Sequence, residues 1–182
     1  MKPLLKLAEW IDALNQKCGI IATAMVFAAC FVSAGNAIIR YIPWTAEYSS
    51  NALLEMQWYM FSYVVMLGAS YTFKMNEHVR VDLVYGNLPP RGKAWVDLLG
   101  TLIFMMPAVV ISAFMAYPFF ADAFVTHEMS QNAGGLIRWP AKLALPLGFG
   151  LLALQGVSEM IKRIGFLTGN LNMDMHYERP VQ

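Results

Sequence analysis

The chain has 182 residues, of which 58% are hydrophobic and 14% are charged. A typical soluble domain is about 45–50% apolar and about 25% charged, so this composition is typical of a chain that lies in lipid, and it excludes most soluble classes. The net charge of +1 is too small to drive binding to a polyanion, and we expect no nucleic-acid partner. Cys18 and Cys30 are too far apart along one apolar stretch to form a disulfide on a helix.

Residues 1–17 are predicted to form an amphipathic helix that lies on the inner membrane surface. Their large apolar side chains recur at helical spacing: Leu4, Leu7, Trp10, Ile11 and Leu14. A cleaved signal peptide and a frayed polar leader are the alternatives. The signal peptide is disfavoured because Glu9 and Asp12 lie in the leader and the following apolar run is longer than a usual signal core.

Four apolar windows follow, and a membrane span needs about 20 such residues. The predicted membrane domain is residues 18–164, and its spans are residues 18–39, 56–73, 96–121 and 142–162. The fourth window is short, but Lys142 and Lys162 flank it and can extend their ammonium groups to the interface. Residues 165–182 are predicted to form a polar cytoplasmic tail. The fold class is therefore an all-α integral membrane protein.

The basic residues between the spans set the predicted orientation. Ten of them lie before the first span, between the second and third, or near the end of the chain: Lys2, Lys6, Lys17, Lys74, Arg80, Arg91, Lys93, Lys162, Arg163 and Arg179. The other segments hold only Arg40, Arg138 and Lys142. Because basic residues concentrate in cytoplasmic segments, both termini are predicted to be cytoplasmic.

The sequence offers little for catalysis. His78, His127 and His176 lie in predicted connections or in the tail, so paired axial ligands for a haem between helices are missing. Within the spans, no Cys, His, Asp or Glu residues stand at metal-site spacing, and the chain has no glycine-rich phosphate loop. We therefore expect no enzyme activity, no metal and no cofactor.

Candidate contacts with a partner subunit come from polar residues near the ends of two spans. Asn36 and Arg40 share one face at the outer end of the first span. Gln155 forms a polar strip with Ser158 and Glu159 near the inner end of the fourth. The alternatives are an arginine that snorkels to the interface and a strip that only caps the helix.

A third candidate group lies in the inner connection. His78, Arg80 and Asp82 mix acidic and basic groups just after the second span, and at least two of them share a face in either a helix or a strand. We interpret them as a structural network that fastens this connection. A catalytic site is the alternative, but nothing nearby supplies a nucleophile or a metal.

Several motifs follow one another along the chain in a distinctive order: Asn36…Arg40-Tyr41, Trp44…Glu47, Gly68-Ala69, Glu77-His78-Val79-Arg80-Val81-Asp82 and Trp139…Lys142…Pro146-Leu147-Gly148-Phe149. Together with the four-span layout, this order resembles the small membrane subunit (the Q-type small permease) of tripartite ATP-independent periplasmic (TRAP) transporters. The likeness covers roughly residues 4–164. The connection at residues 126–139 looks longer than in the compact members of that family.

The resemblance implies a complex in the bacterial inner membrane. A soluble periplasmic binding protein would capture an organic acid, a large multispan subunit would carry it inward with sodium ions, and the small subunit would support the large one and help dock the binding protein. Arg40, Trp44 and Glu47 would then lie on the outer side, where the binding protein arrives. Membrane lipid is the remaining expected partner.

Two other classes stay open from the residues alone. A self-contained homo-oligomeric carrier or channel would need a charge in the middle of a span, and the apolar windows have none. A membrane anchor of a redox enzyme would need histidines on the helices.

Overall fold

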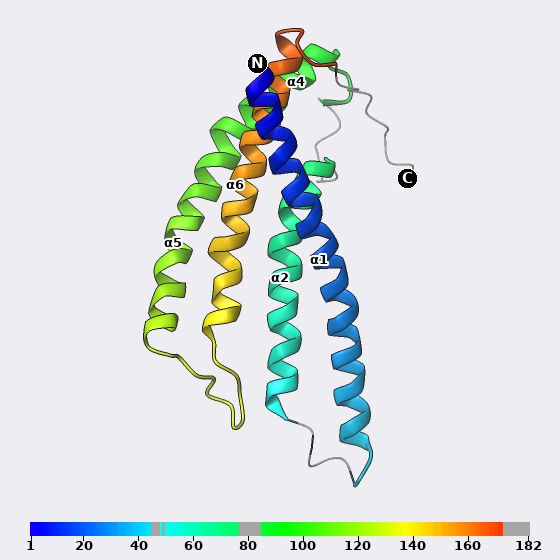
Figure 1. The fold of residues 1–182 in the computed structure, drawn as a ribbon, viewed down its shortest axis with the longest axis vertical. Coiled ribbons are helices and arrows are strands. Elements are labelled where there is room, and N and C mark those ends of the chain that lie inside the picture. Colours follow the sequence, from blue (N-terminus) through cyan, green and yellow to red (C-terminus); the bar gives the residue numbers. More distant parts are fainter. Residues whose placement is uncertain (45–47, 49, 77–84, 173–182) are drawn as a thin grey trace.

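The computed structural model describes residues 1–44, 48, 50–76 and 85–172, and the elements within these ranges are helices (Figure 1). They are α1 (Lys2–Tyr41), α2 (Asn51–Met75), α4 (Pro90–Gly100), the π-helical turn η2 (Thr101–Met105), α5 (Met106–Val125) and α6 (Trp139–Leu167). α4, η2 and α5 follow one another without interruption and form one long helix. The expected all-helical class is confirmed for the described part of the chain.

Within the described residues, three helices are long and apolar enough to cross a membrane: Lys2–Tyr41, Pro90–Val125 and Trp139–Leu167. They contain the predicted first, third and fourth spans. The predicted second span, residues 56–73, lies inside α2, which has 25 residues. α2 is therefore long enough, but it has no window as apolar as those of the other three helices.

α1 is a single helix of 40 residues, which corresponds to about 60 Å at 1.5 Å per residue. The predicted surface helix and the predicted first span are parts of this one helix, which continues past residue 17 without a break. Ala8, Ile11 and Asn15 form a buried stripe on the first half of α1, whereas Trp10 is 63% exposed. The amphipathic pattern of this half therefore includes a face that packs on the rest of the bundle.

Proline and a left-handed residue mark several helix ends. α1 stops at Tyr41 because Ile42 precedes Pro43 and takes an extended conformation, with φ −91° and ψ 115°. α2 ends at Asn76, whose φ of 62° is left-handed and whose N–H donates to the Phe73 carbonyl. Pro90 opens α4, where a missing N–H costs no helical hydrogen bond.

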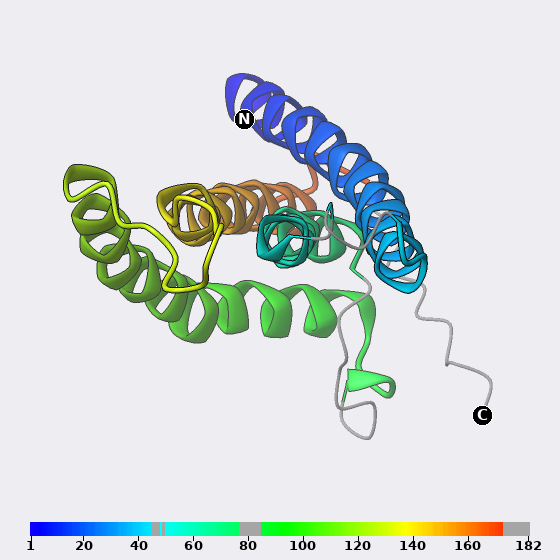
Figure 2. The same cartoon turned by 90° about the horizontal axis from the view of Figure 1, so that it is seen from below.

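The long helix contains a π-helical turn just before Pro107. The Met106 N–H donates to the Thr101 carbonyl, five residues back, and Pro107 follows directly. Because Pro107 has no N–H to donate to the carbonyl four residues before it, a wide turn at this point keeps the helix continuous. The helix bends along its length, as Figure 2 shows from below.

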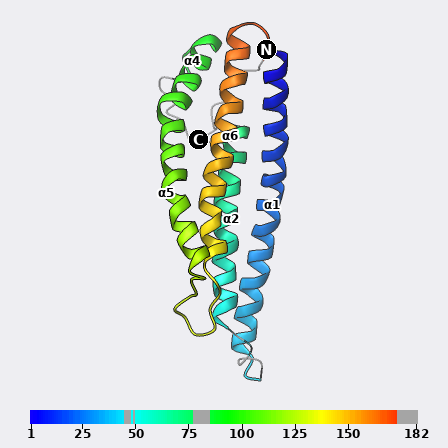
Figure 3. The same cartoon turned by 60° about the vertical axis from the view of Figure 1, so that its left-hand side comes forward.

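α2 and α6 lie in the middle of the bundle, with α1 on one side and α5 on the other (Figures 2 and 3). α2 and α6 approach closely at Gly148, where an added Cβ would lie 2.5 Å from the Met66 Cβ. A second close approach joins α6 to the long helix, because a Cβ on Gly156 would lie 2.8 Å from the Met106 sulfur. Small residues at such crossings let membrane helices pack tightly.

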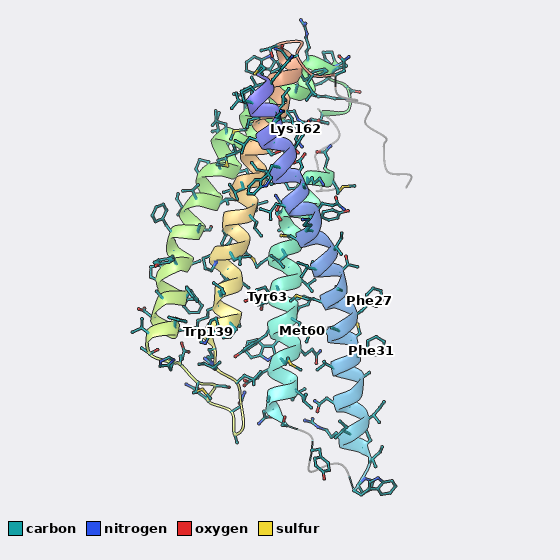
Figure 4. All side chains as sticks on the ribbon, viewed as in Figure 1. Phe27, Phe31, Met60, Tyr63, Trp139 and Lys162 are labelled. Carbon is teal, nitrogen blue, oxygen red and sulfur yellow. The ribbon has the colours of Figure 1, made fainter. Side chains whose placement is uncertain are left out.

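The bundle has two distinct ends. The N-terminus, α4 and the end of α6 lie together at one end, and the end of α1, the start of α2 and the α5–α6 connection lie at the other (Figure 1). We call these the N-terminal end, marked by Lys162 in Figure 4, and the hairpin end, marked by Trp139. Between them, Phe27 and Phe31 point away from the bundle and are 64% and 76% exposed (Figure 4).

Candidate functional site

A buried amide at the N-terminal end joins α6 to α1. The Gln155 side chain is fully buried, and its Oε1 accepts a hydrogen bond from Asn15 Nδ2 at 2.7 Å. Its Nε2 donates to Asp12 Oδ1 at 2.9 Å and to Glu159 Oε1 at 3.2 Å. Ser158 also donates to Asp12 Oδ1, at 2.8 Å. The strip predicted on the fourth span therefore faces α1 inside this chain.

Charged groups extend this network from α1 to α4. Lys162 Nζ lies 3.0 Å from Asp12 Oδ2 and also pairs with Glu159. Arg163 Nε lies 3.1 Å from Asp97 Oδ2, and its NH2 lies 3.5 Å from Glu159 Oε2. Because these groups are largely removed from water, each depends on its partner, and removal of one member of such a buried pair costs about 3–5 kcal/mol.

We call this group of residues the N-terminal network, and its role is to join helices to one another. Its acids and bases bond to one another and connect three helices that are distant in the sequence. Among the residues that the structure describes, no group of three or more His, Cys, Asp and Glu side chains is arranged to hold a metal ion. The network therefore holds α1, α4 and α6 in register.

At the hairpin end, a carboxylate of α2 holds the connection between α5 and α6. Glu55 is 2% exposed, and its Oε1 accepts hydrogen bonds from the Ser130 hydroxyl and, at 2.9 Å, from Asn132 Nδ2. Its Oε2 accepts from the Leu136 N–H at 2.6 Å. These hydrogen bonds, that of Ser130 foremost, lower the pKa of Glu55 below its ordinary value, and their effect outweighs that of burial.

The same face of α2 carries three further donors to this connection. Asn51 Nδ2 donates to the Ala133 carbonyl at 2.9 Å. The Tyr59 hydroxyl donates to the Ile137 carbonyl at 3.1 Å, and the Tyr63 hydroxyl donates to the Pro140 carbonyl at 2.8 Å. With Glu55, these residues stand four apart along α2, so they form one row on the helix surface. Tyr59 and Tyr63 of this row lie within the predicted second span and help explain why α2 has no window as apolar as those of the other three long helices.

An ion-pair group closes the base of the connection. Glu128 pairs with Arg138 at 3.4 Å and, more closely, with Lys142. The hydrogen bond from Lys142 is the main reason that the pKa of Glu128 falls below its ordinary value. Lys142 Nζ also lies 4.0 Å from the centroid of the Phe119 ring on α5, a cation–π contact. The start of α6 is thereby fixed to the end of α5.

The structure places the predicted candidate residues in different surroundings. Asn36 is 4% exposed, Arg40 is exposed at the last turn of α1, and Trp44 is 79% exposed just beyond it. These three lie toward the hairpin end, whereas Gln155 belongs to the N-terminal network. The other candidates lie outside the described residues: Glu47, His78, Arg80 and Asp82.

Sequence reasoning missed the burial of two charged groups inside the bundle, because Glu55 and Arg163 are 2% and 7% exposed. Glu159, which belongs to the predicted polar strip with Gln155, is 7% exposed. The signal for the α6 groups was their spacing by four residues, from Gln155 to Glu159 and from Glu159 to Arg163, which places them on one helix face. The signal for Glu55 was the row spaced by four residues along α2.

One family comparison covers most of the chain. The family described as "Tripartite ATP-independent periplasmic transporters, DctQ component" matches residues 29–165. No curated protein and no solved structure matches the chain. The matched range includes Glu55, the α5–α6 connection and the α6 part of the N-terminal network.

Proposed function

Because the chain belongs to the family of DctQ components of tripartite ATP-independent periplasmic transporters, we propose that it is the non-catalytic small subunit of a sodium-coupled organic-acid importer. In this role it supports the large transport subunit and helps dock the periplasmic binding protein. We place it in the bacterial inner membrane with four spans, of which α2 is the second. The apolar lengths of the other three helices support a membrane location.

The observation that carries this proposal is where the charged groups of the bundle lie and what they bind. In the described part of the chain, the ion pairs gather at the two ends, and each forms between residues of this chain: Asp12 and Glu159 with Lys162, Asp97 and Glu159 with Arg163, and Glu128 with Arg138 and Lys142. Proteins that carry ions or acids across a membrane usually keep an ionisable group at membrane depth. Here the charged groups hold helices together, which suits a supporting subunit.

The proposed orientation has the N-terminal end in the cytoplasm and the hairpin end outside. It rests on the excess of Lys and Arg in the segments at the N-terminal end. α1, at about 60 Å, exceeds the roughly 30 Å of hydrocarbon that it has to cross. We therefore place its first turns at the inner interface, where the exposed Trp10 ring suits the headgroup region.

Each candidate residue has a role in this proposal. Arg40, which is exposed at the last turn of α1, contacts the large subunit, and Arg40→Ala is expected to reduce co-purification of that subunit. Asn36 lies one turn earlier, is 4% exposed, and supports this contact from inside the chain. Trp44, with its 79% exposed side chain, and Glu47 contribute to docking outside. Gln155 contributes inside this chain, because the hydrogen bonds of its buried amide hold α1 against α6.

His78, Arg80 and Asp82 complete the proposal as a network that fastens the inner connection. The support is their mixed charge on a segment that follows α2. A catalytic use of these residues is not part of the proposed function.

Reconstitution tests the proposed function directly. Liposomes would hold the purified chain alone, the large subunit encoded with it, or both, under an inward sodium gradient, and the binding protein would be added outside with labelled organic acids. We expect uptake only with all three proteins and sodium. Uptake of a labelled acid by the chain alone would contradict the accessory role and support a self-contained carrier.

A further inference from the structure

The connection between α5 and α6, residues 126–138, contains a hairpin, residues 128–138, with its own backbone hydrogen bonds. Met129 and Ile137 form an antiparallel bridge. The Ser130 N–H donates to the Leu136 carbonyl at 3.0 Å, and the Arg138 N–H donates to the Glu128 carbonyl at 2.8 Å. At the turn, Gly134 has a φ of 69°, a conformation that favours glycine. The backbone of this hairpin therefore adopts one defined shape.

Side chains of α2 also hold the hairpin in place. Glu55 binds Ser130, Asn132 and the Leu136 N–H, so one carboxylate bonds to both strands of the hairpin. Asn51 holds the turn through the Ala133 carbonyl at 2.9 Å. A Cβ on Gly135 would lie 2.9 Å from Glu55 Oε1, so the hairpin sits close against this carboxylate.

So many hydrogen bonds are not needed in a segment that only links two helices. Neighbouring helices in a bundle are commonly joined by about 2–8 residues, and surface loops are ordinarily the more variable and mobile parts of a protein. Here a longer connection is bound through the row of polar side chains on α2. A surface that is already ordered binds a partner with less loss of conformational entropy.

The outward side of the hairpin shows which partner it suits. Residues 131–134 at the tip are exposed and uncharged, and Met129 is 57% exposed beside them. The tip lies beyond the ends of α5 and α6 (Figure 1), so it projects from the helix pair that it joins and can be reached from the hairpin end. Uncharged polar groups with one adaptable methionine suit a soluble protein surface that approaches from water.

We propose that residues 128–138 form a preformed docking surface for the soluble binding protein of the transporter. This inference rests on the proposed function, which supplies both the partner and the outer location of the hairpin end. It assigns the contact to the tip, residues 131–134, and to Met129. Glu55 acts as a positioning residue, because it holds the hairpin in shape from below without contacting the partner.

A bulky side chain at the tip tests the docking surface. Gln131→Trp places a large ring on an exposed position, and Asn170→Trp places the same ring on an exposed position near the N-terminal end as a matched control. The complex of the chain with its large subunit would be held in nanodiscs, and the affinity of the binding protein would be measured by surface binding. We expect Gln131→Trp to weaken binding by about tenfold or more, as a well-placed interface residue does, with the control unchanged.

A second measurement covers the case in which Gln131→Trp fails to fold. A photo-crosslinking amino acid at position 131 is expected to join the chain to the binding protein, whereas the same group at position 170 is not. Unchanged affinity of Gln131→Trp, or a crosslink from position 131 to the large subunit instead, would overturn the proposal. Failure of the wild-type chain to co-purify with the large subunit would count against the proposed function itself, which separates the two outcomes.

Discussion

Gly148 of α6 lies directly against Met66 of α2, so that an added Cβ would meet the Met66 backbone oxygen at 2.9 Å and the Met66 Cβ at 2.5 Å. A backbone atom cannot move aside as the end of a flexible side chain can. Gly148→Ala is therefore expected to push α2 and α6 apart and to destabilise the bundle by about 1–3 kcal/mol, the usual cost of overpacking. The measurement is thermal unfolding of the purified chain in lipid nanodiscs.

Gly150 supplies the matched control for this prediction. It lies two residues further along α6, and a Cβ there would meet nothing within 4 Å. Gly150→Ala should leave the unfolding midpoint almost unchanged, within about 0.5 kcal/mol. Equal destabilisation by both variants would show that the contact with Met66 does not set the spacing of α2 and α6.

The pair formed by Arg163 and Asp97 is expected to hold α6 against α4. Their side chains are 9% and 11% exposed, so Arg163→Met would leave the Asp97 carboxylate buried with its closest cation removed. We expect a loss of about 3–5 kcal/mol of stability, seen as a lower thermal midpoint in nanodiscs. The double variant Arg163→Met, Asp97→Leu should lose less than the sum of the two single variants, because residues in contact are not additive. Strict additivity would speak against a direct pair.

The sequence predicted the helices well because apolar windows and prolines act locally. Pro43 and Pro90 lie at helix boundaries that the structure shows, and both effects need only neighbouring residues. The continuity of α1 past residue 17 has a local reason as well. The charges there mark a change of surroundings, but neither a proline nor a left-handed residue stops the helix, so α1 continues.

The contacts of Glu55 could not be predicted in the same way. The sequence separation of this carboxylate from Ser130 is 75 residues, and from the Leu136 N–H it is 81. Nothing in the local pattern of α2 says which loop will cross it, because that depends on how α2 and α6 pack. The row of polar residues four apart on α2 can be read in the sequence, but the row alone does not identify the segment that it binds.

The hydroxyl of Tyr63 gives a narrower test of that row. Tyr63→Phe removes the 2.8 Å hydrogen bond to the Pro140 carbonyl and keeps the ring that packs in the bundle. We expect a loss of about 0.5–1.5 kcal/mol, the usual net contribution of one hydrogen bond, measured by the thermal midpoint. Tyr41→Phe is the control, because the Tyr41 ring is 88% exposed. A larger effect at position 41 than at position 63 would contradict the proposed anchoring of the connection.

The hairpin should loosen in acid, and Glu55 should account for part of that change. The hydrogen bonds from Ser130, the Leu136 N–H and Asn132 lower the pKa of Glu55 in the folded chain. A lowered pKa means that this carboxylate stabilises the fold fully above its unfolded pKa of about 4.3, and that the contribution is lost as the pH falls through the lower folded value. Limited proteolysis of the hairpin from pH 7 downward should therefore accelerate below about pH 4.3.

The variant Glu55→Gln separates this contribution from that of Glu128, whose pKa is also lowered and which therefore loosens the hairpin base over a similar range. The Gln side chain has only one acceptor oxygen, so one of the hydrogen bonds to the hairpin is lost. Proteolytic cleavage of the hairpin at neutral pH should therefore already be faster than in the wild type, and the acid-dependent increase should be smaller. Glu9→Gln, an exposed position near the N-terminal end, should leave both rates unchanged. If Glu55→Gln kept the wild-type rate at neutral pH together with the full acid response, the carboxylate of Glu55 would not be what holds the hairpin.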